Sequence, residues 1–328
     1  MGGGSYSRDV GRSSSSGSFS SGGTSSSRAK SDLSQYGLHN DLKPNRVITS
    51  LKESPIVIAL DVTGSNREFS RIVYDKAPML HGQIEQQGYL KDFDICFTAV
   101  GDAYCDRAPL QVCDFDYGIN LDKHLKKLFL EGGGGGQTME TYELAAHYFN
   151  TKCEMPNAKM PFFFYIGDEA PYPVVESRII ENVMGETGAN TLESKLVFSK
   201  LYKKFEGNVF YLQNPYCGRD RDTAERIRSA WIQQIGVENT EKIIPVHEEK
   251  SVIDLILGVI AMTSHARTLD SYRTDMVQRG QTSTRVANVD KSLGQFETRV
   301  AKKPKQNAVS VPRKRSSRSR KRSGAKII

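Results

Sequence analysis

Two unbroken apolar runs, residues 56–60 (IVIAL) and 162–166 (FFFYI), limit most strictly what this chain can fold into. A strand with one face in water alternates apolar and polar residues. A continuous apolar run of this length instead indicates a strand covered on both faces, which is typical of parallel sheets. Further apolar segments predict strands at 93–100, 209–212 and 243–246, with a short one at 110–115.

Segments with helical periodicity separate these strands. One helix follows the first strand and is expected to kink or break at Pro78. Asp222 and Glu225 are spaced as a capping box for the helix that carries Trp231. The remaining helices are predicted at 119–130, 139–149, 192–205 and 252–262. This alternation predicts an α/β fold, in which helices cover both faces of a doubly wound, mostly parallel, six-stranded sheet.

Charge is segregated along the chain. The formal net charge is +7, yet residues 299–328 hold 12 basic residues and no acidic one, while residues 51–298 carry a net −8. Residues 1–30 contain 12 Ser and 7 Gly, too little apolar surface to offset the entropy of ordering. We therefore predict a disordered segment at 1–50, a folded domain at 51–266, a partly helical extension at 267–301 and a disordered basic tail at 302–328.

No segment suggests export or membrane insertion. The longest apolar stretch, 252–262, contains Asp254 and is shorter than the roughly 18 residues that a spanning helix needs. The N-terminus has no apolar signal segment, and the five cysteines form no CxxC pair. We expect a cytoplasmic protein with reduced thiols and no membrane contact, or a nuclear one if the tail acts as an import signal in a eukaryotic cell.

Oxygen donors follow the strands at the edge where their carboxyl ends meet. Asp61, Thr63 and Ser65 come directly after the first strand, Thr138 follows a run of five glycines at 132–136, and Asp168 follows the strand at 162–166. Ligands of such folds bind in the crevice beyond these strand ends. Carboxylates and hydroxyls without His or Cys favour Mg²⁺, Mn²⁺ or Ca²⁺ over zinc.

These motifs resemble the metal-ion-dependent adhesion site of von Willebrand factor type A domains. Asp61, Thr63 and Ser65 match the family's D-x-[ST]-x-S motif, with Thr where Ser is usual. Thr138 in GGGQTMETYELA matches its second-loop threonine, and Asp168 in FFFYIGDEA matches its aspartate after the fourth strand. The resemblance covers roughly residues 54–266. It implies that these five residues hold a divalent cation, that a partner protein's Asp or Glu completes its coordination, and that the protein is an adaptor rather than an enzyme.

The second loop leaves one ligand open. Thr138 is the better match, but Thr141 is the alternative because the family often repeats the threonine and this chain has Glu140 between the two. Glu140 and Glu169 could add charge and change the preferred ion, although we expect both to be solvated rather than ligating.

Two other functions compete with this interpretation. Asp61 could be the nucleophile of a metal-dependent phosphoryl-transfer enzyme, paired with the acidic motif GDAYCD at 101–106. Thr63 stands where such enzymes need a second aspartate, so Asp102 and Asp106 are expected to shape a loop instead. No histidine forms a base–nucleophile pair. The tail at 299–328 could contact nucleic acid through phosphates, without base stacking, because no aromatic residue follows Phe296.

Overall fold

Strand β2 (Ser54–Asp61) is buried along its whole length, and its side chains alternate between two hydrophobic cores. Ile56, Ile58 and Leu60 point into one core, whereas Val57 and Ala59 point into the other. Successive side chains of a strand point to opposite faces of the sheet. The unbroken apolar run at 56–60 therefore fills both cores, as its sequence predicts.

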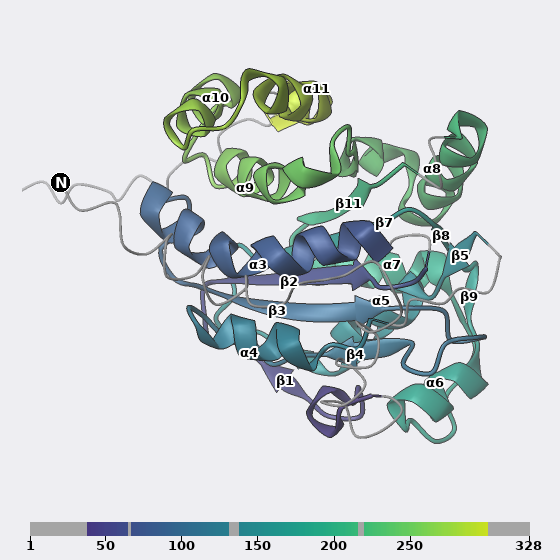
Figure 1. The fold of residues 1–328 in the computed structure, drawn as a ribbon. Coiled ribbons are helices and arrows are strands. Elements are labelled where there is room, and N and C mark those ends of the chain that lie inside the picture. Colours follow the sequence, from purple (N-terminus) through teal and green to yellow (C-terminus); the bar gives the residue numbers. More distant parts are fainter. Residues whose placement is uncertain (1–37, 65–66, 131–137, 216–219, 301–328) are drawn as a thin grey trace, which may run out of the picture.

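The computed structural model describes residues 38–64, 67–130, 138–215 and 220–300. Its main sheet has six strands in the order β12-β11-β7-β2-β3-β4 (Figure 1). All neighbouring strands are parallel except β3 and β4, which are antiparallel. The mixed, mostly parallel α/β sheet confirms the predicted class. The strands besides β2 are β3 (Phe93–Val100), β4 (Leu110–Val112), β7 (Phe162–Gly167), β11 (Val209–Gln213) and β12 (Ile243–Pro245).

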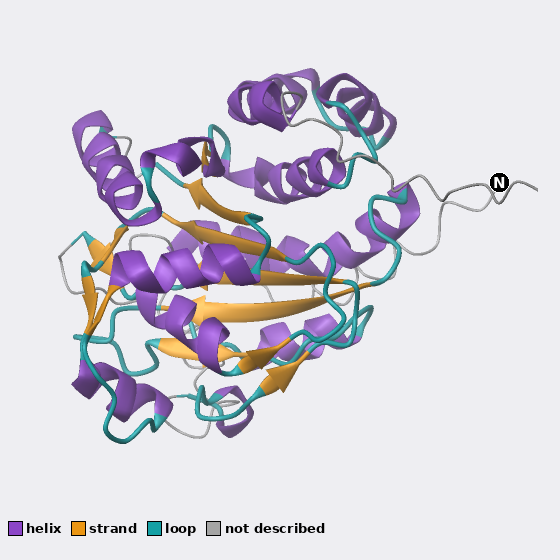
Figure 2. Cartoon of the chain, turned by 180° about the vertical axis from the view of Figure 1, so that it is seen from behind, coloured by secondary structure: helices purple, strands orange, loops and turns teal. Residues whose placement is uncertain are grey.

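Helices pack on both faces of this sheet, as Figures 1 and 2 show from opposite sides. The first core is covered by α3 (Arg67–Gln87), α4 (Asn120–Lys127) and α9 (Val252–Thr263). The second is covered by α5 (Tyr142–Thr151), α6 (Ser177–Met184), α7 (Ser194–Lys204) and α8 (Arg221–Ile235). The predicted extension forms α10 (Leu269–Gln278) and α11 (Ser283–Val300), which place Tyr272, Leu293 and Phe296 in the first core.

Short elements extend the folded body beyond the predicted limits. The 3₁₀ helix η1 (Asn40–Leu42) and strand β1 (Ile48–Thr49) precede the main sheet, and β1 pairs with β6 (Cys153–Glu154). Leu42 and Ile48 are buried. The prediction of disorder through residue 50 is therefore wrong for 38–50, because two isolated apolar side chains give little periodic signal. Residues 1–37 and the basic tail from 301 lie outside the described residues.

Three local predictions about helices need comment, and two of them are wrong. Of the kink or break predicted at Pro78, the break does not occur, because α3 continues through this residue and the packing of Val73, Ala77 and Leu80 in the core outweighs the lost hydrogen bond. The N-cap of α8 is Asp220, whose carboxylate accepts a hydrogen bond from the Asp222 amide. Residues 139 and 140 are not helical. They form β5 (Met139–Glu140), which pairs with β8 (Ala170–Pro171) and delays the start of α5 to residue 142.

The remaining elements are small. Strands β9 (Val174–Val175) and β10 (Leu192–Glu193) pair with each other, and two further 3₁₀ helices, η2 (Val237–Lys242) and η3 (Glu249–Ser251), flank β12. Within the described ranges, no helix has both the length and the apolar character needed to cross a membrane.

Candidate functional site

The strand order reverses between β2 and β7. From β2 the chain builds outward through β3 and β4, whereas β7, β11 and β12 build outward on the other side. Connections leave in opposite directions at such a switch point and open a crevice beyond the strand ends. Asp61 is the last residue of β2, and Asp168 directly follows β7. The predicted site therefore lies at the position where α/β sheets bind ligands.

The Asp61 carboxylate is fully buried and surrounded by oxygen and nitrogen atoms. Its Oδ1 accepts hydrogen bonds from the Thr63 amide (2.9 Å) and the Thr63 hydroxyl (2.7 Å). Its Oδ2 accepts one from the Tyr142 hydroxyl at 3.1 Å. Burial raises the pKa of Asp61, and hydrogen bonds from Thr63, Tyr142 and Asp168 oppose that shift. Asp61, Thr63 and Asp168 are thus brought together as the sequence predicts.

Aromatic side chains hold the loop that carries Asp168. The Tyr211 hydroxyl donates to the carbonyls of Gly167 (3.1 Å) and Glu169 (3.0 Å), and Trp231 Nε1 donates to Glu169 at 2.9 Å. The rings of Tyr211 and Trp231 stack with centroids 4.2 Å apart. The sequence does not predict these hydrogen bonds, because aromatic residues in a strand or a helix indicate only that the residues belong to a hydrophobic core.

Gly167 is required by close approach. A Cβ atom there would lie 2.0 Å from the Tyr142 hydroxyl and 3.0 Å from Cβ of Asp61. No real Cβ contact is that short, so any other residue would displace Tyr142 or Asp61. The glycine lets the two strand ends lie close enough for their aspartates to meet.

The structure separates the two candidate threonines. The Thr138 carbonyl accepts a hydrogen bond from the Ala170 amide at 3.1 Å, which places this half-buried residue beside the loop of Asp168. The Thr141 hydroxyl instead donates to the Gly101 carbonyl at 2.5 Å. Thr138 thus lies beside the loop of Asp168, and Thr141 contacts the end of β3. Ser65 and the glycine run at 132–136 lie outside the described residues.

Two further carboxylates are buried at this edge. Glu140 and Glu169 are only 3% and 4% exposed, so the expectation that both are solvated is wrong. The pairing of β5 with β8 draws the loops of both residues together. Burial raises the pKa of Glu140, and the charges of Asp61 and Glu169 raise it further. Oε2 of Glu140 is buried and, among the described residues, has no hydrogen-bond partner. Acidic side chains are thus buried together at this edge, and a bound cation would favour their charged forms.

Asp102 and Asp106 shape the loop after β3, as predicted. Asp102 Oδ1 accepts from the Tyr104 amide at 3.0 Å, and its Oδ2 accepts from the Tyr172 hydroxyl at 3.2 Å. Asp106 Oδ2 accepts from the Asp102 amide at 2.7 Å. These hydrogen bonds give Asp102 and Asp106 a structural role in the loop after β3.

The donor set determines what this edge could hold. In the part of the chain that the structure describes, no group of three or more His, Cys, Asp or Glu side chains is arranged to hold a metal ion. The four described cysteines are free thiols, at Cys96, Cys105, Cys113 and Cys153. A cation at this edge would therefore depend on hydroxyl ligands from Thr63 and Thr138 as well as on the carboxylates of Asp61 and Asp168.

Comparison with known proteins identifies no family. No protein-family model matches the chain, and no curated protein matches it. Among solved structures, it is similar to the pilus adhesin SpaC from Lactobacillus rhamnosus GG in its open conformation, with a TM-score of 0.46 and 10% identity over 66% of this chain. It is also similar to proximal thread matrix protein 1 from the mussel byssus, with a TM-score of 0.39, 10% identity and 67% coverage.

The chain spans only part of each of these proteins. The match covers 31% of the adhesin and 49% of the mussel protein. At TM-scores below 0.5 the likeness supports no inference about the function of this chain.

Proposed function

We propose that this chain is a von Willebrand type A-like interaction module that binds a divalent cation at the switch point and uses it to capture an acidic residue of a partner protein. Mg²⁺ or Mn²⁺ suits the oxygen donors best, with Ca²⁺ as the alternative. Asp61, Thr63, Ser65, Thr138 and Asp168 would hold the ion, directly or through water. The protein would then act as an adaptor in an assembly.

The observation that carries this proposal is the meeting of Asp61 and Asp168. They stand at the ends of strands on either side of the switch point, both are fully buried, and the Asp168 side chain lies close enough to Asp61 to act on its pKa. The Thr63 hydroxyl lies 2.7 Å from Asp61 Oδ1, so three hard oxygen ligands from two loops converge. Burying two carboxylates side by side is costly unless positive charge or a proton compensates.

Glu140 adds to the argument for a cation. Its buried Oε2 has no hydrogen-bond partner among the described residues, and the carboxylates of Asp61 and Glu169 lie near enough to raise its pKa. A divalent ion would offset this repulsion. An ion bound mainly through hydroxyls keeps an open coordination position, which a partner's carboxylate would fill.

The proposal is tested first by thermal unfolding of the full chain in EDTA and then in Mg²⁺, Mn²⁺ or Ca²⁺. A ligand that binds only the folded state at a hundredfold excess over its Kd stabilises by about 2.7 kcal/mol. We expect a stabilisation of that order in the wild type and none in Asp61→Asn or Asp168→Asn. Asp92→Asn is the matched control, because Asp92 is an exposed carboxylate paired with Lys52, and it should respond like the wild type.

The partner's role is tested with side-chain analogues. At saturating Mg²⁺, N-acetyl-glutamate amide should stabilise the wild type further, whereas N-acetyl-glutamine amide, which lacks the carboxylate, should not. If no divalent ion stabilises the wild type, or if the Asp61 and Asp168 variants respond as strongly as the wild type, the metal proposal is wrong.

A further inference from the structure

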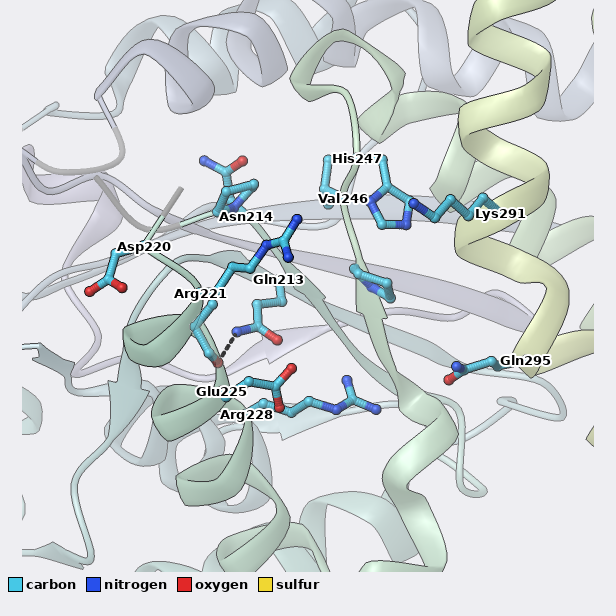
Figure 3. Close-up of a pocket in the computed structure, with 13 residues that line it drawn as sticks. Gln213, Asn214, Asp220, Arg221, Glu225, Arg228, Val246, His247, Lys291 and Gln295 are labelled. Carbon is cyan, nitrogen blue, oxygen red and sulfur yellow. Dashed lines mark hydrogen bonds between the residues drawn. The ribbon is translucent and has the colours of Figure 1, made fainter. Parts of the chain in front are cut away.

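A cavity opens beside the candidate ion site, beyond the carboxyl ends of β11 and β12. Its volume is about 700 Å³, and α8 and α11 form its opposite walls (Figure 3). We call it the groove. Asn214 lines it, and the Asn214 amide donates to the Gly167 carbonyl at 2.8 Å. The groove therefore begins one residue from Asp168 and continues the same edge of the sheet.

The charge of the groove differs from that of the folded body. Residues 51–298 carry a net −8, yet Arg221, Arg228 and Lys291 all line this cavity. Burial lowers the pKa of His247, and the charge of Lys291 lowers it further. Three cationic side chains line the groove beside the carboxylates of Asp220 and Glu225, so its formal net charge is +1, a local exception on the acidic folded body.

Some of these groups already have partners. Arg228 donates to the carbonyls of Ile243 (3.1 Å) and Thr240 (3.4 Å), and the charge of Glu225 acts on it. The Asp220 carboxylate caps α8 and accepts from the Asp222 amide at 3.1 Å. Arg228 and Asp220 therefore have structural roles, in contacts within the chain.

Arg221 and Lys291 are different. Both are exposed, and neither forms an ion pair within the described ranges of the chain. Figure 3 shows them on opposite walls, Arg221 from α8 and Lys291 from α11. Two cations that face one cavity from different elements, with no ion-pair partner among the described residues, suit a ligand with more than one negative charge.

We propose that the groove binds an acidic peptide segment, whose carboxylates pair with Arg221 on one wall and Lys291 on the other. The side-chain amides of Asn214 and Gln295 also line the cavity. They would form hydrogen bonds with the backbone of the peptide. Among the described residues that line the groove there is no Phe, Tyr or Trp, and His247 supplies its one aromatic ring, so a run of bases would find little stacking surface there. Because Arg221 and Lys291 lie outside the predicted ion ligands, this inference does not depend on the ion.

The test measures binding of a fluorescein-labelled octaglutamate peptide to the full chain by fluorescence anisotropy. EDTA keeps the candidate ion site out of the measurement, and about 50 mM salt limits screening. We expect Arg221→Glu/Lys291→Glu to raise the Kd about tenfold or more, since two attractions become repulsions. Lys302→Glu/Lys303→Glu is the matched control, because it changes the net charge equally within the basic tail, and its Kd should change less than about threefold.

The outcomes separate the groove from the tail and from other ligands. A milder pair, Arg221→Gln/Lys291→Gln, should weaken binding in the same direction and replaces the first pair if that one does not fold. The inference is overturned if the wild type does not bind the peptide, or if the tail variant loses as much affinity as the groove variant. Tighter binding of an octauridylate that the groove variant abolishes would also overturn it, by assigning the groove to nucleic acid.

Discussion

Two regions of this molecule bury acidic side chains, and they treat the charge in opposite ways. On the face covered by α10 and α11, Asp254 lies 3.1 Å from an Arg279 nitrogen and 3.9 Å from an Arg285 nitrogen. At the carboxyl edge of the sheet, Asp61 is bound by the neutral hydroxyls of Thr63 and Tyr142 and by a second carboxyl group.

The contrast indicates what each region is for. Burial raises the pKa of Asp254, and the two arginines oppose that shift, so this acid is neutralised within the chain and ties the C-terminal helices to the core. Burial also raises the pKa of Glu140, but there the neighbouring carboxylates add to the shift. A buried acid with its own cation is structural, whereas a group of acids that repel one another favours a cation from solution.

The largest change in stability should come from removing the buried ion pair between Arg279 and Asp254. Arg279→Ala leaves Asp254 buried without its nearest cation, which should lower the free energy of unfolding by about 3 kcal/mol, measured by urea denaturation. Arg273→Ala removes the exposed pairs with Asp270 of the same helix and with Asp290 of α11 and should cost under about 1 kcal/mol. Equal costs for the two variants would show that Asp254 does not need its partner.

The next largest effect should come from disturbing the close packing at the carboxyl edge of the sheet. Gly167→Ala introduces a Cβ only 2.0 Å from the Tyr142 hydroxyl and should destabilise by about 2 kcal/mol, within the usual range for overpacking. Gly294→Ala is the control, because a Cβ atom at this position would meet no atom within 4 Å. Gly294 lies in the interior of α11, where alanine should stabilise the helix by up to about 1 kcal/mol. A stable Gly167→Ala variant would mean that the edge can relax.

Asp94, at the opposite edge of the sheet, shows what burial does to a single carboxylate. Burial raises its pKa to about 6, although the Ser50 hydroxyl donates to it at 2.8 Å. The folded state therefore binds this proton more tightly than the unfolded state, whose pKa is about 3.9. The free energy of unfolding should fall by about 2 kcal/mol as the pH rises from about 4 to above 6.

Asp94→Asn isolates this contribution. The difference between the wild type and this variant in urea denaturation, measured at several pH values, removes the contribution of the other acids. If the difference in the free energy of unfolding between the wild type and Asp94→Asn does not change over this pH range, the pKa of Asp94 is not raised. Burial by itself would then not be enough to raise the pKa of a carboxyl group in this protein.

The smallest effect tests the uncompensated region directly. In EDTA, Glu140→Gln removes a source of repulsion and should raise the free energy of unfolding by up to about 1 kcal/mol. With Mg²⁺ present, the same variant should gain less stability from the ion than the wild type does. Glu53→Gln, at an exposed pair with Lys159, should change neither. A variant that is equally destabilised with and without the ion would show that the Glu140 carboxylate is already satisfied.

Much of the fold could be predicted because its signals are local. The runs at 56–60 and 162–166 fill two cores at once, and their pattern predicts strands covered on both faces. The meeting of Asp61 and Asp168 also follows from sequence, because both residues stand directly after strands whose carboxyl ends share one edge. At Pro78, where the sequence predicts a kink or a break, α3 does not break, because packing in the core outweighs the local preference of proline.

The sequence by itself determined the strands, the segregation of charge and the order of the oxygen donors, because periodicity and composition act over a few neighbouring residues. Only the tertiary structure decided that Glu140 and Glu169 are buried. It also decided that the Thr141 hydroxyl donates a hydrogen bond to the Gly101 carbonyl. The hydrogen bonds of Tyr211 and Trp231 that hold the loop of Asp168 likewise depend on it. It also brought Arg221 and Lys291 to one groove from helices α8 and α11. These contacts join residues far apart in the chain, and no local pattern encodes which distant groups meet when the layers pack.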